Sequence, residues 1–145
     1  MCFKNLWFFR STHPDIEMIF LTGDFPAHDV WRQDRIHNKA SSKAIVDAVK
    51  RHFPDTHVYP AIGNHEMFPV NMFPDEDQPV PKIYDPSWLY NNLADLYENW
   101  LPGPQQQKTL RDSGYYSVSI FIKPYLKVSK SRYVSYAMMF QSCLN

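Results

Sequence analysis

Two short stretches of this chain combine carboxylate, amide and imidazole side chains in a pattern typical of divalent-metal sites. The first reads Thr-Gly-Asp-Phe-Pro-Ala-His and places Asp24 and His28 four residues apart. The second reads Gly-Asn-His-Glu and holds Asn64, His65 and Glu66. Hard divalent metals take carboxylate and amide oxygens, and zinc also takes imidazole nitrogen. The two stretches therefore predict a metal site, in which a carboxylate could bridge two ions that clamp a phosphoryl group.

The histidines of such a site could act in proton transfer, because a histidine that is not bound to metal can protonate a leaving oxygen. Alone, the Gly-Asp of the first stretch carries almost no signal, since such pairs usually form turns, whereas Gly-Asn-His-Glu after a strand is moderately specific. Together, one strand–helix–strand unit apart, they are a strong signal. His28 has the alternative of a solvated loop residue, and Glu66 is interpreted as a structural carboxylate without a direct role.

The segments around these residues predict a strand–helix–strand unit. Residues 16–22 are mostly apolar and end in Gly-Asp, which indicates a buried strand followed by a turn. Residues 33–53 carry apolar side chains in rows four apart, as one face of a helix does, and Pro54 stops that helix. Residues 57–62 predict a second short strand. Parallel pairing through a crossover helix is the default for such a unit.

This topology makes the two chemical stretches neighbours. Each stretch follows one of the predicted strands, Asp24 the first and Asn64 the second. Open α/β sheets place their sites in the loops at the carboxyl ends of parallel strands. We therefore expect Asp24 and Asn64 to lie on adjacent loops at one edge of the sheet.

The remainder of the chain predicts fewer elements. Residues 67–86 read as a long, proline-rich and acidic loop. Residues 87–101 repeat apolar and aromatic pairs every four positions, which predicts a helix ended by the Pro-Gly-Pro that follows. Residues 114–122 predict a third strand.

Composition limits the possible classes of protein. The chain has 145 residues, enough for one domain, and its 44% hydrophobic and 21% charged residues favour a packed core. Its formal net charge of zero argues against a nucleic-acid partner. The apolar N-terminus is too short for a signal peptide and lacks a small-residue cleavage site. The two cysteines, Cys2 and Cys143, define no disulfide framework.

Longer strings around both stretches resemble the calcineurin-like metallophosphoesterases and, among them, the acid sphingomyelinases. These strings are TGDFPAHDVW at residues 22–31, YPAIGNHE at residues 59–66 and PVNMFP at residues 69–74. The resemblance covers residues 15–122 as a partial domain and leaves residues 1–14 and 123–145 unassigned. The AHDVW and PVN strings fit the acid sphingomyelinases better than the related nucleotide-cleaving phosphodiesterases.

The resemblance implies an α/β fold, namely part of a metallophosphoesterase sandwich with a strand–helix–strand unit, an aromatic helix and a further strand. It also implies a role for each site residue. Asp24 would bridge two zinc ions, and Asn64 would ligate one of them. His65 would contact the phosphate and help protonate the leaving group, and His28 would be the second histidine on the leaving-group side.

The implied activity is zinc-dependent hydrolysis of sphingomyelin to ceramide and phosphocholine, at a membrane lipid surface, in lysosomes or outside the cell. The family's Asp-x-His block is missing before Asp24, and no Gly-His-x-His string occurs. We therefore expect this chain to be incomplete and inactive alone. Two alternatives stay open: a related phosphodiesterase that acts on nucleotides or other phosphodiesters, and a non-catalytic fragment with no independent function.

Overall fold

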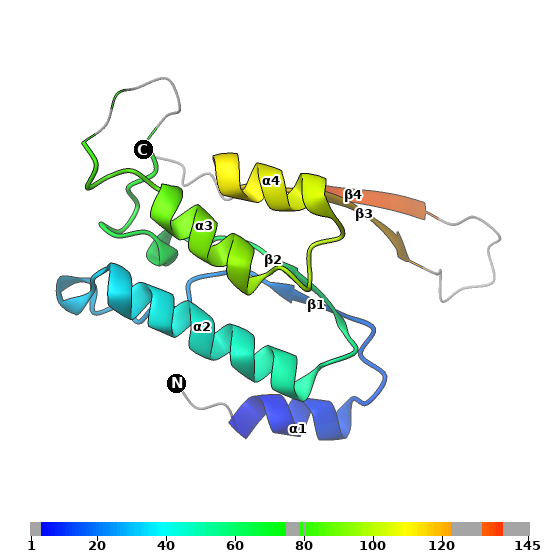
Figure 1. The fold of residues 1–145 in the computed structure, drawn as a ribbon. Helices are drawn as coiled ribbons and strands as arrows, with labels where there is room; N and C mark the ends of the chain where they lie inside the picture. Colours follow the sequence, from blue (N-terminus) through cyan, green and yellow to red (C-terminus); the bar gives the residue numbers. More distant parts are fainter. Residues whose placement is uncertain (1–3, 75–78, 80, 123–131, 138–145) are drawn as a thin grey trace.

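The computed structural model describes residues 4–74, 79, 81–122 and 132–137, and mixes helices with strands (Figure 1). The helices are α1 (Lys4–Thr12), α2 (Arg35–His52), α3 (Ser87–Leu96) and α4 (Pro104–Ser113), with short 3-10 turns η1 (Val30–Arg32) and η2 (Asn64–Glu66). The strands are β1 (Met18–Leu21), β2 (His57–Pro60), β3 (Ser117–Ile122) and β4 (Arg132–Ala137). Among the described residues, no helix combines the length and apolarity needed to span a membrane.

The predicted strand–helix–strand unit is confirmed. Strands β1 and β2 pair in parallel, from Met18 opposite His57 to Leu21 opposite Pro60, and α2 is the crossover helix between them. Helix α2 begins after Asp34, whose side chain accepts a hydrogen bond from a backbone N–H in the first turn. It ends two residues before the proline that was expected to stop it.

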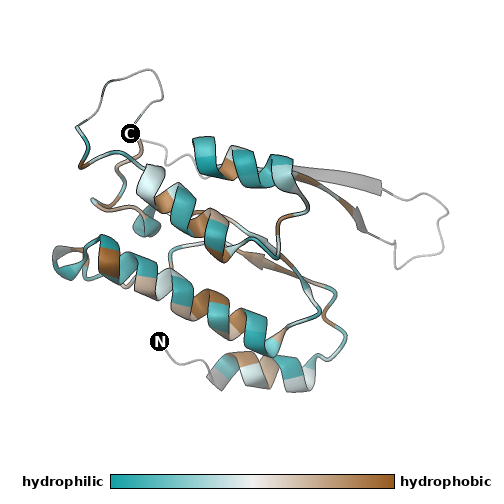
Figure 2. Ribbon diagram, in the orientation of Figure 1, coloured by the Kyte–Doolittle hydropathy of each residue, from teal (hydrophilic) through white to brown (hydrophobic). Residues whose placement is uncertain are grey.

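Two groups of apolar side chains hold these elements together, and Figure 2 shows hydrophobic positions recurring along α2 and α3. The first group joins α2 to the parallel sheet and is centred on buried Val49, Phe53 and Val58. The second group joins α2, α3, α4 and the segments after β2, and its buried members are Val46, Ile62, Met67, Leu89, Leu93, Ala94, Tyr97, Leu101, Leu110 and Tyr116. The sheet is therefore fixed from one side by α2, which is the element that spaces the two site loops.

The C-terminal half differs from its prediction in length and number of elements. The helix expected over residues 87–101 ends at Leu96, and the chain continues in turns that still bury Tyr97 and Leu101. Helices α1 and α4 were not predicted. Helix α4 is mostly polar and buries Leu110 alone, so it lacks the apolar periodicity that would reveal it.

The third predicted strand is present as β3, but its partner is β4, which lies in the unassigned C-terminal range. These two strands pair antiparallel and form a sheet separate from β1 and β2. The Tyr116 hydroxyl donates a hydrogen bond to the Pro60 carbonyl at 2.8 Å, and so links the start of this hairpin to β2. The described strands thus confirm an α/β chain with a small parallel sheet.

Candidate active site

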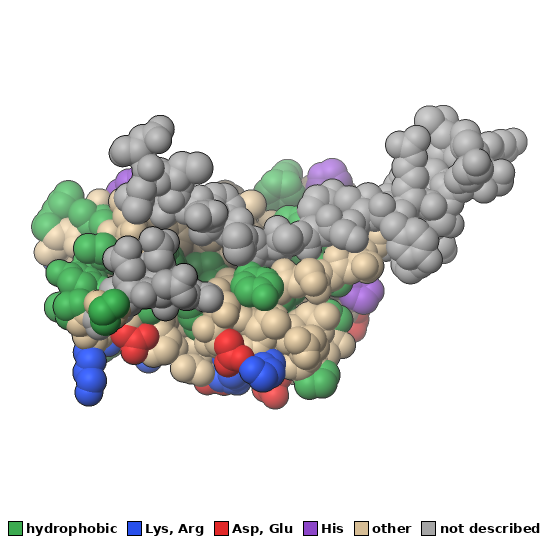
Figure 3. All heavy atoms as spheres, turned by 90° about the horizontal axis from the view of Figure 1, so that it is seen from above, with side chains coloured by type: hydrophobic (Ala, Val, Ile, Leu, Met, Phe, Trp, Pro, Cys, Tyr) green, Lys and Arg blue, Asp and Glu red, His purple; other side chains and the backbone are tan. Residues whose placement is uncertain are grey.

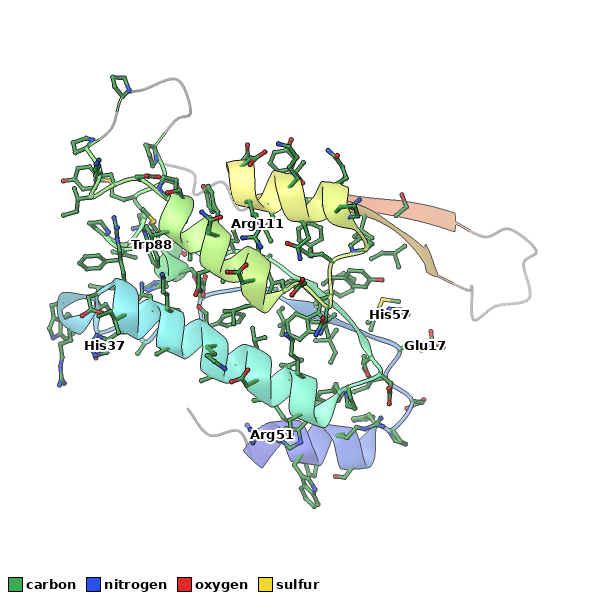
Figure 4. The ribbon with its side chains drawn as sticks, in the orientation of Figure 1. Glu17, His37, Arg51, His57, Trp88 and Arg111 are labelled. Atoms are coloured by element: carbon green, nitrogen blue, oxygen red, sulfur yellow. The ribbon has the colours of Figure 1, made fainter. Side chains whose placement is uncertain are left out.

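The loops after β1 and β2 meet at one end of the parallel sheet. Figure 4 shows Glu17 and His57, at the starts of the two strands, together at the end of the molecule opposite His37 and Trp88. The strands therefore run toward the end where α2 begins. A hydrogen bond from the Ala61 N–H to the Leu21 carbonyl, 2.6 Å long, carries the pairing past the last ladder residues. The convergence expected from the sequence is confirmed for these loops.

Two glycines allow the loops to touch through their backbones. A Cβ atom on Gly23 would overlap the backbone nitrogen of Gly63, and Gly23 also has a φ of +81°, in the left-handed region. A Cβ atom on Gly63 would overlap the Asp24 carboxylate. Any side chain at either position would push the two chemical stretches apart.

The Asp24 carboxylate lies directly against the second stretch. Its Oδ1 accepts a hydrogen bond from the His65 backbone N–H at 3.0 Å. Asp24 itself has a φ of 58°, which non-glycine residues adopt rarely and mostly where the surrounding structure enforces it. The structure therefore brings Asp24 next to Asn64 and His65, while the roles of these side chains as metal ligands and acids stay predictions.

Glu66 joins the two loops through hydrogen bonds whose partners the sequence did not reveal. It is fully buried and its carboxylate accepts hydrogen bonds from the backbone N–H groups of Gly63 (2.7 Å), Asp24 (2.9 Å) and Phe25 (2.6 Å). Burial raises the pKa of Glu66 above its ordinary value, and the Asp24 charge adds to this, against the three N–H donors. The interpretation of Glu66 as a structural carboxylate agrees with these contacts.

The two predicted histidines also come together. The ring centroids of His28 and His65 are 4.2 Å apart, with the planes tilted by 38°. His28 is exposed, whereas His65 is 8% exposed and its Nδ1 has no hydrogen-bond partner. A buried imidazole nitrogen without a partner is costly, so it is a position at which a ligand or proton donor would be stabilised.

The donor set fits a divalent metal in kind but is incomplete in number. Asp24 and Asn64 offer a carboxylate and an amide oxygen, the ligand types that such ions take. Within the described part of the chain, no cluster of three or more His, Cys, Asp or Glu side chains could hold a metal ion. Catalytic zinc normally keeps three protein ligands, so these loops alone would bind it weakly.

No family model matches the sequence, but comparison with known proteins finds several that are similar to it. It is 41% identical to sphingomyelin phosphodiesterase of Bos taurus over 104 residues, which are 71% of this chain and 16% of that protein. It is 37% identical to sphingomyelin phosphodiesterase B of Dictyostelium discoideum over 107 residues, 73% of this chain and 16% of that protein.

A more distant relative is cyclic GMP-AMP phosphodiesterase SMPDL3A of Bos taurus, 28% identical over 131 residues, 88% of this chain and 26% of that protein. The chain therefore spans 16% of the length of the sphingomyelin phosphodiesterases that it matches. All three relatives are phosphodiesterases by name, and the two more similar ones share one name. The chain is homologous to a segment of the sphingomyelin phosphodiesterases.

Proposed function

We propose that residues 15–122 form part of the catalytic domain of a zinc-dependent phosphodiesterase that hydrolyses sphingomyelin to ceramide and phosphocholine. The observation that carries the proposal is the direct contact between the Asp24 carboxylate and the His65 backbone, in a chain homologous to sphingomyelin phosphodiesterases. The unit formed by β1, α2 and β2 would contribute to a metallophosphoesterase sandwich in the complete domain. Two strands and one crossover helix are compatible with that architecture.

In this proposal each site residue has a defined task. Asp24 would bridge the two zinc ions and Asn64 would ligate one of them. When bound, the ions would supply Lewis-acid activation of water and of the phosphodiester. Water would attack phosphorus and release one proton, the bond from phosphorus to the ceramide oxygen would break, and that oxygen would take a proton. His65 and His28 would supply this proton, a contribution of about 10²–10⁴-fold in rate.

The same reasoning makes the isolated chain inactive. Two protein oxygens cannot complete two zinc coordination spheres, because catalytic zinc keeps about three protein ligands per ion. Proton donation by the histidines alone is a small part of the acceleration that phosphodiester hydrolysis needs. We expect no sphingomyelin hydrolysis by residues 1–145 with zinc added, at acidic or neutral pH.

Because the isolated chain is expected to be inactive, the proposal is tested with a chimaera. Residues 15–122 would replace the aligned segment of the Bos taurus sphingomyelin phosphodiesterase, whose remaining length would supply the missing metal ligands. We expect zinc-dependent release of phosphocholine from sphingomyelin vesicles. Asp24→Ala should reduce it to background because the bridging carboxylate is lost, and His65→Ala should reduce it about 10²-fold or more.

The matched control is His57→Ala, which removes an exposed histidine at the opposite end of the sheet. This variant should keep the activity of the unmodified chimaera. A chimaera that folds and binds zinc but does not hydrolyse sphingomyelin would favour a non-catalytic fragment. Full activity of Asp24→Ala would refute the assigned metal ligand.

A second candidate is hydrolysis of nucleotide phosphodiesters. The match to the cyclic GMP-AMP phosphodiesterase favours it, because that match covers 88% of this chain although at 28% identity. Exchanging the aligned segment into each Bos taurus relative separates the two candidates. We expect the sphingomyelin phosphodiesterase chimaera to keep the larger fraction of its parent's activity. If the chimaera of the cyclic GMP-AMP phosphodiesterase keeps the larger fraction instead, the nucleotide substrate is favoured.

The proposed setting is a membrane lipid surface in lysosomes or outside the cell. Exposed apolar side chains support contact with lipid: Trp31 is 80% and Ile36 is 77% exposed, in segments adjoining the first site loop. Figure 3 shows hydrophobic side chains gathered at the left end of the molecule, the end at which Figure 1 places the start of α2. Co-sedimentation with sphingomyelin vesicles and cell fractionation check the setting, and a protein found only in cytosol would contradict it.

A further inference from the structure

Backbone conformation singles out a second residue beside Asp24. The described part of the chain contains two non-glycine residues with positive φ, Asp24 at 58° and Asn71 at 66°. The left-handed region costs an L-residue roughly 1–2 kcal/mol, although Asn tolerates it better than most. Such conformations persist where the surrounding structure enforces them, often at functional sites. Asn71 is therefore a candidate for a role at the site, seven residues after Asn64.

The contacts of Asn71 lead directly to Asn64. The Asn64 Nδ2 donates a hydrogen bond to the Asn71 Oδ1 at 2.6 Å. The Asn71 backbone N–H donates to the Asn64 carbonyl at 3.4 Å. The left-handed turn at Asn71 thus returns the chain toward η2 and places a side-chain acceptor on the nitrogen end of the Asn64 amide.

This arrangement decides which end of the Asn64 amide is available to a ligand. A carboxamide has donors at its nitrogen and acceptors at its oxygen, so a metal can use the oxygen alone. Holding Nδ2 against Asn71 turns Oδ1 away from Asn71. With the Asn71 amide in its present orientation, a flipped Asn64 amide would direct its two N–H donors at the ion and would bring two oxygens together at Asn71.

We propose that Asn71 is a positioning residue that fixes the Asn64 amide with its oxygen available to metal. The inference rests on the proposed function, since it gives Asn64 the role of a ligand. Asn71 is exposed, and a hydrogen bond between exposed amides contributes little to stability. Its effect is on orientation, as with other hydrogen-bond partners of metal ligands, whose loss costs about 10–100-fold in metal affinity.

Two substitutions separate this role from that of a simple turn residue. Asn71→Gly keeps the left-handed backbone, which glycine adopts freely, and removes the acceptor. Asn71→Asp keeps an oxygen acceptor on a residue type that also tolerates positive φ. A turn residue would be replaced best by glycine, whereas a positioning residue would be replaced best by aspartate.

NMR of the ¹⁵N-labelled 145-residue chain without metal reads the orientation directly. We expect the Asn64 side-chain NH₂ to exchange slowly with water in the wild type and in Asn71→Asp, and to lose this protection in Asn71→Gly. Thermal unfolding of all three proteins should agree within a few degrees, which separates orientation from folding.

A manganese titration of the same samples measures how the amide orientation affects metal affinity. Mn²⁺ prefers oxygen ligands and broadens nearby resonances when it binds weakly. Asn71→Gly should weaken binding at Asp24 and Asn64 about 10-fold or more, and Asn71→Asp should bind at least as tightly as the wild type. An unchanged Asn64 NH₂ signal in Asn71→Gly, or a loss in Asn71→Asp equal to that in Asn71→Gly, overturns the proposal. Absence of binding in all three means that Asp24 and Asn64 alone do not hold Mn²⁺, and the Asn64 NH₂ signal then decides the positioning role.

Discussion

Glu66 shows at the scale of one residue how the site loops are held. Its two carboxylate oxygens accept hydrogen bonds from three backbone N–H groups. These groups belong to two segments about forty positions apart in the sequence. A buried N–H without a partner costs about 1–3 kcal/mol, so these donors need an acceptor at this place. A carboxylate is the side chain best suited to the task, since it accepts at both oxygens and donates at neither when ionised.

The prediction at this scale is that Glu66→Gln lowers the free energy of unfolding by about 2–3 kcal/mol. Glutamine offers one acceptor oxygen, and its NH₂ group would face a backbone donor. Urea unfolding followed by circular dichroism measures the change. Glu98→Gln, at an exposed position, is the control and should change stability by less than about 0.5 kcal/mol. Equal stability of the two variants would contradict the fastening role.

At the scale of elements, the position of the site depends on how closely two strand ends approach. Parallel pairing of β1 and β2 aligns their carboxyl ends, and α2 sets the crossover. The glycines at positions 23 and 63 then allow backbone contact between the loops. The separation of the chemical groups therefore depends on small residues as much as on the strands.

Gly63→Ala should separate the loops and lower the free energy of unfolding by more than about 2 kcal/mol. The new methyl group would overlap the Asp24 carboxylate and backbone nitrogen, and overpacking of a tight contact costs about 1–3 kcal/mol even before the bonds to Glu66 are lost. Gly103→Ala is the control: a Cβ there would lie 3.5 Å from its nearest neighbour, and its loss as a helix cap should cost about 0.5–1 kcal/mol. Chemical denaturation measures the free energy of unfolding of both variants. If Gly63→Ala lowers it no more than Gly103→Ala does, the two loops are not closely packed at Gly63.

At the scale of the whole molecule, β3 and β4 form a sheet separate from β1 and β2, and a buried hydrogen bond from the residue before β3 reaches the end of β2. Tyr116 is 2% exposed and belongs to the apolar group around α3, while its hydroxyl donates a hydrogen bond to the Pro60 carbonyl at the end of β2. Burial raises the pKa of Tyr116 well above its usual range. The two halves of the chain are therefore coupled through a phenol that must stay neutral.

Tyr116→Phe should cost about 1–2 kcal/mol at neutral pH, because the Pro60 carbonyl loses its partner. The unfolded chain releases the phenolic proton near pH 10 while the folded chain retains it, so wild-type stability should fall as the pH rises above about 10. The stability of Tyr116→Phe should fall less over the same pH range, so the difference in free energy of unfolding between wild type and this variant should become smaller. Tyr115→Phe, at an exposed position, serves as the control in denaturation at pH 7 and above pH 10. Parallel pH dependences of Tyr116→Phe and wild type would rule out this coupling.

Elements with local signals could be predicted from the amino-acid sequence. Apolar rows and Pro54 marked α2, apolar runs before turns marked β1 and β2, and the parallel default placed the two chemical stretches at one edge. The residues of those stretches were readable too, because their types and spacing suit metal and proton chemistry. Their catalytic roles stay predictions that the chimaera can test.

The contacts that hold those residues could not be predicted from the sequence and are visible only in the folded chain. The three bonds to Glu66, the Asn71 contact to the Asn64 amide and the pairing of β3 with β4 carry no signal in periodicity. Helix α4 was missed because a single buried leucine leaves no apolar stripe. Periodicity reports interactions between residues a turn or a strand position apart, whereas these contacts depend on which distant backbone groups burial leaves in need of a partner.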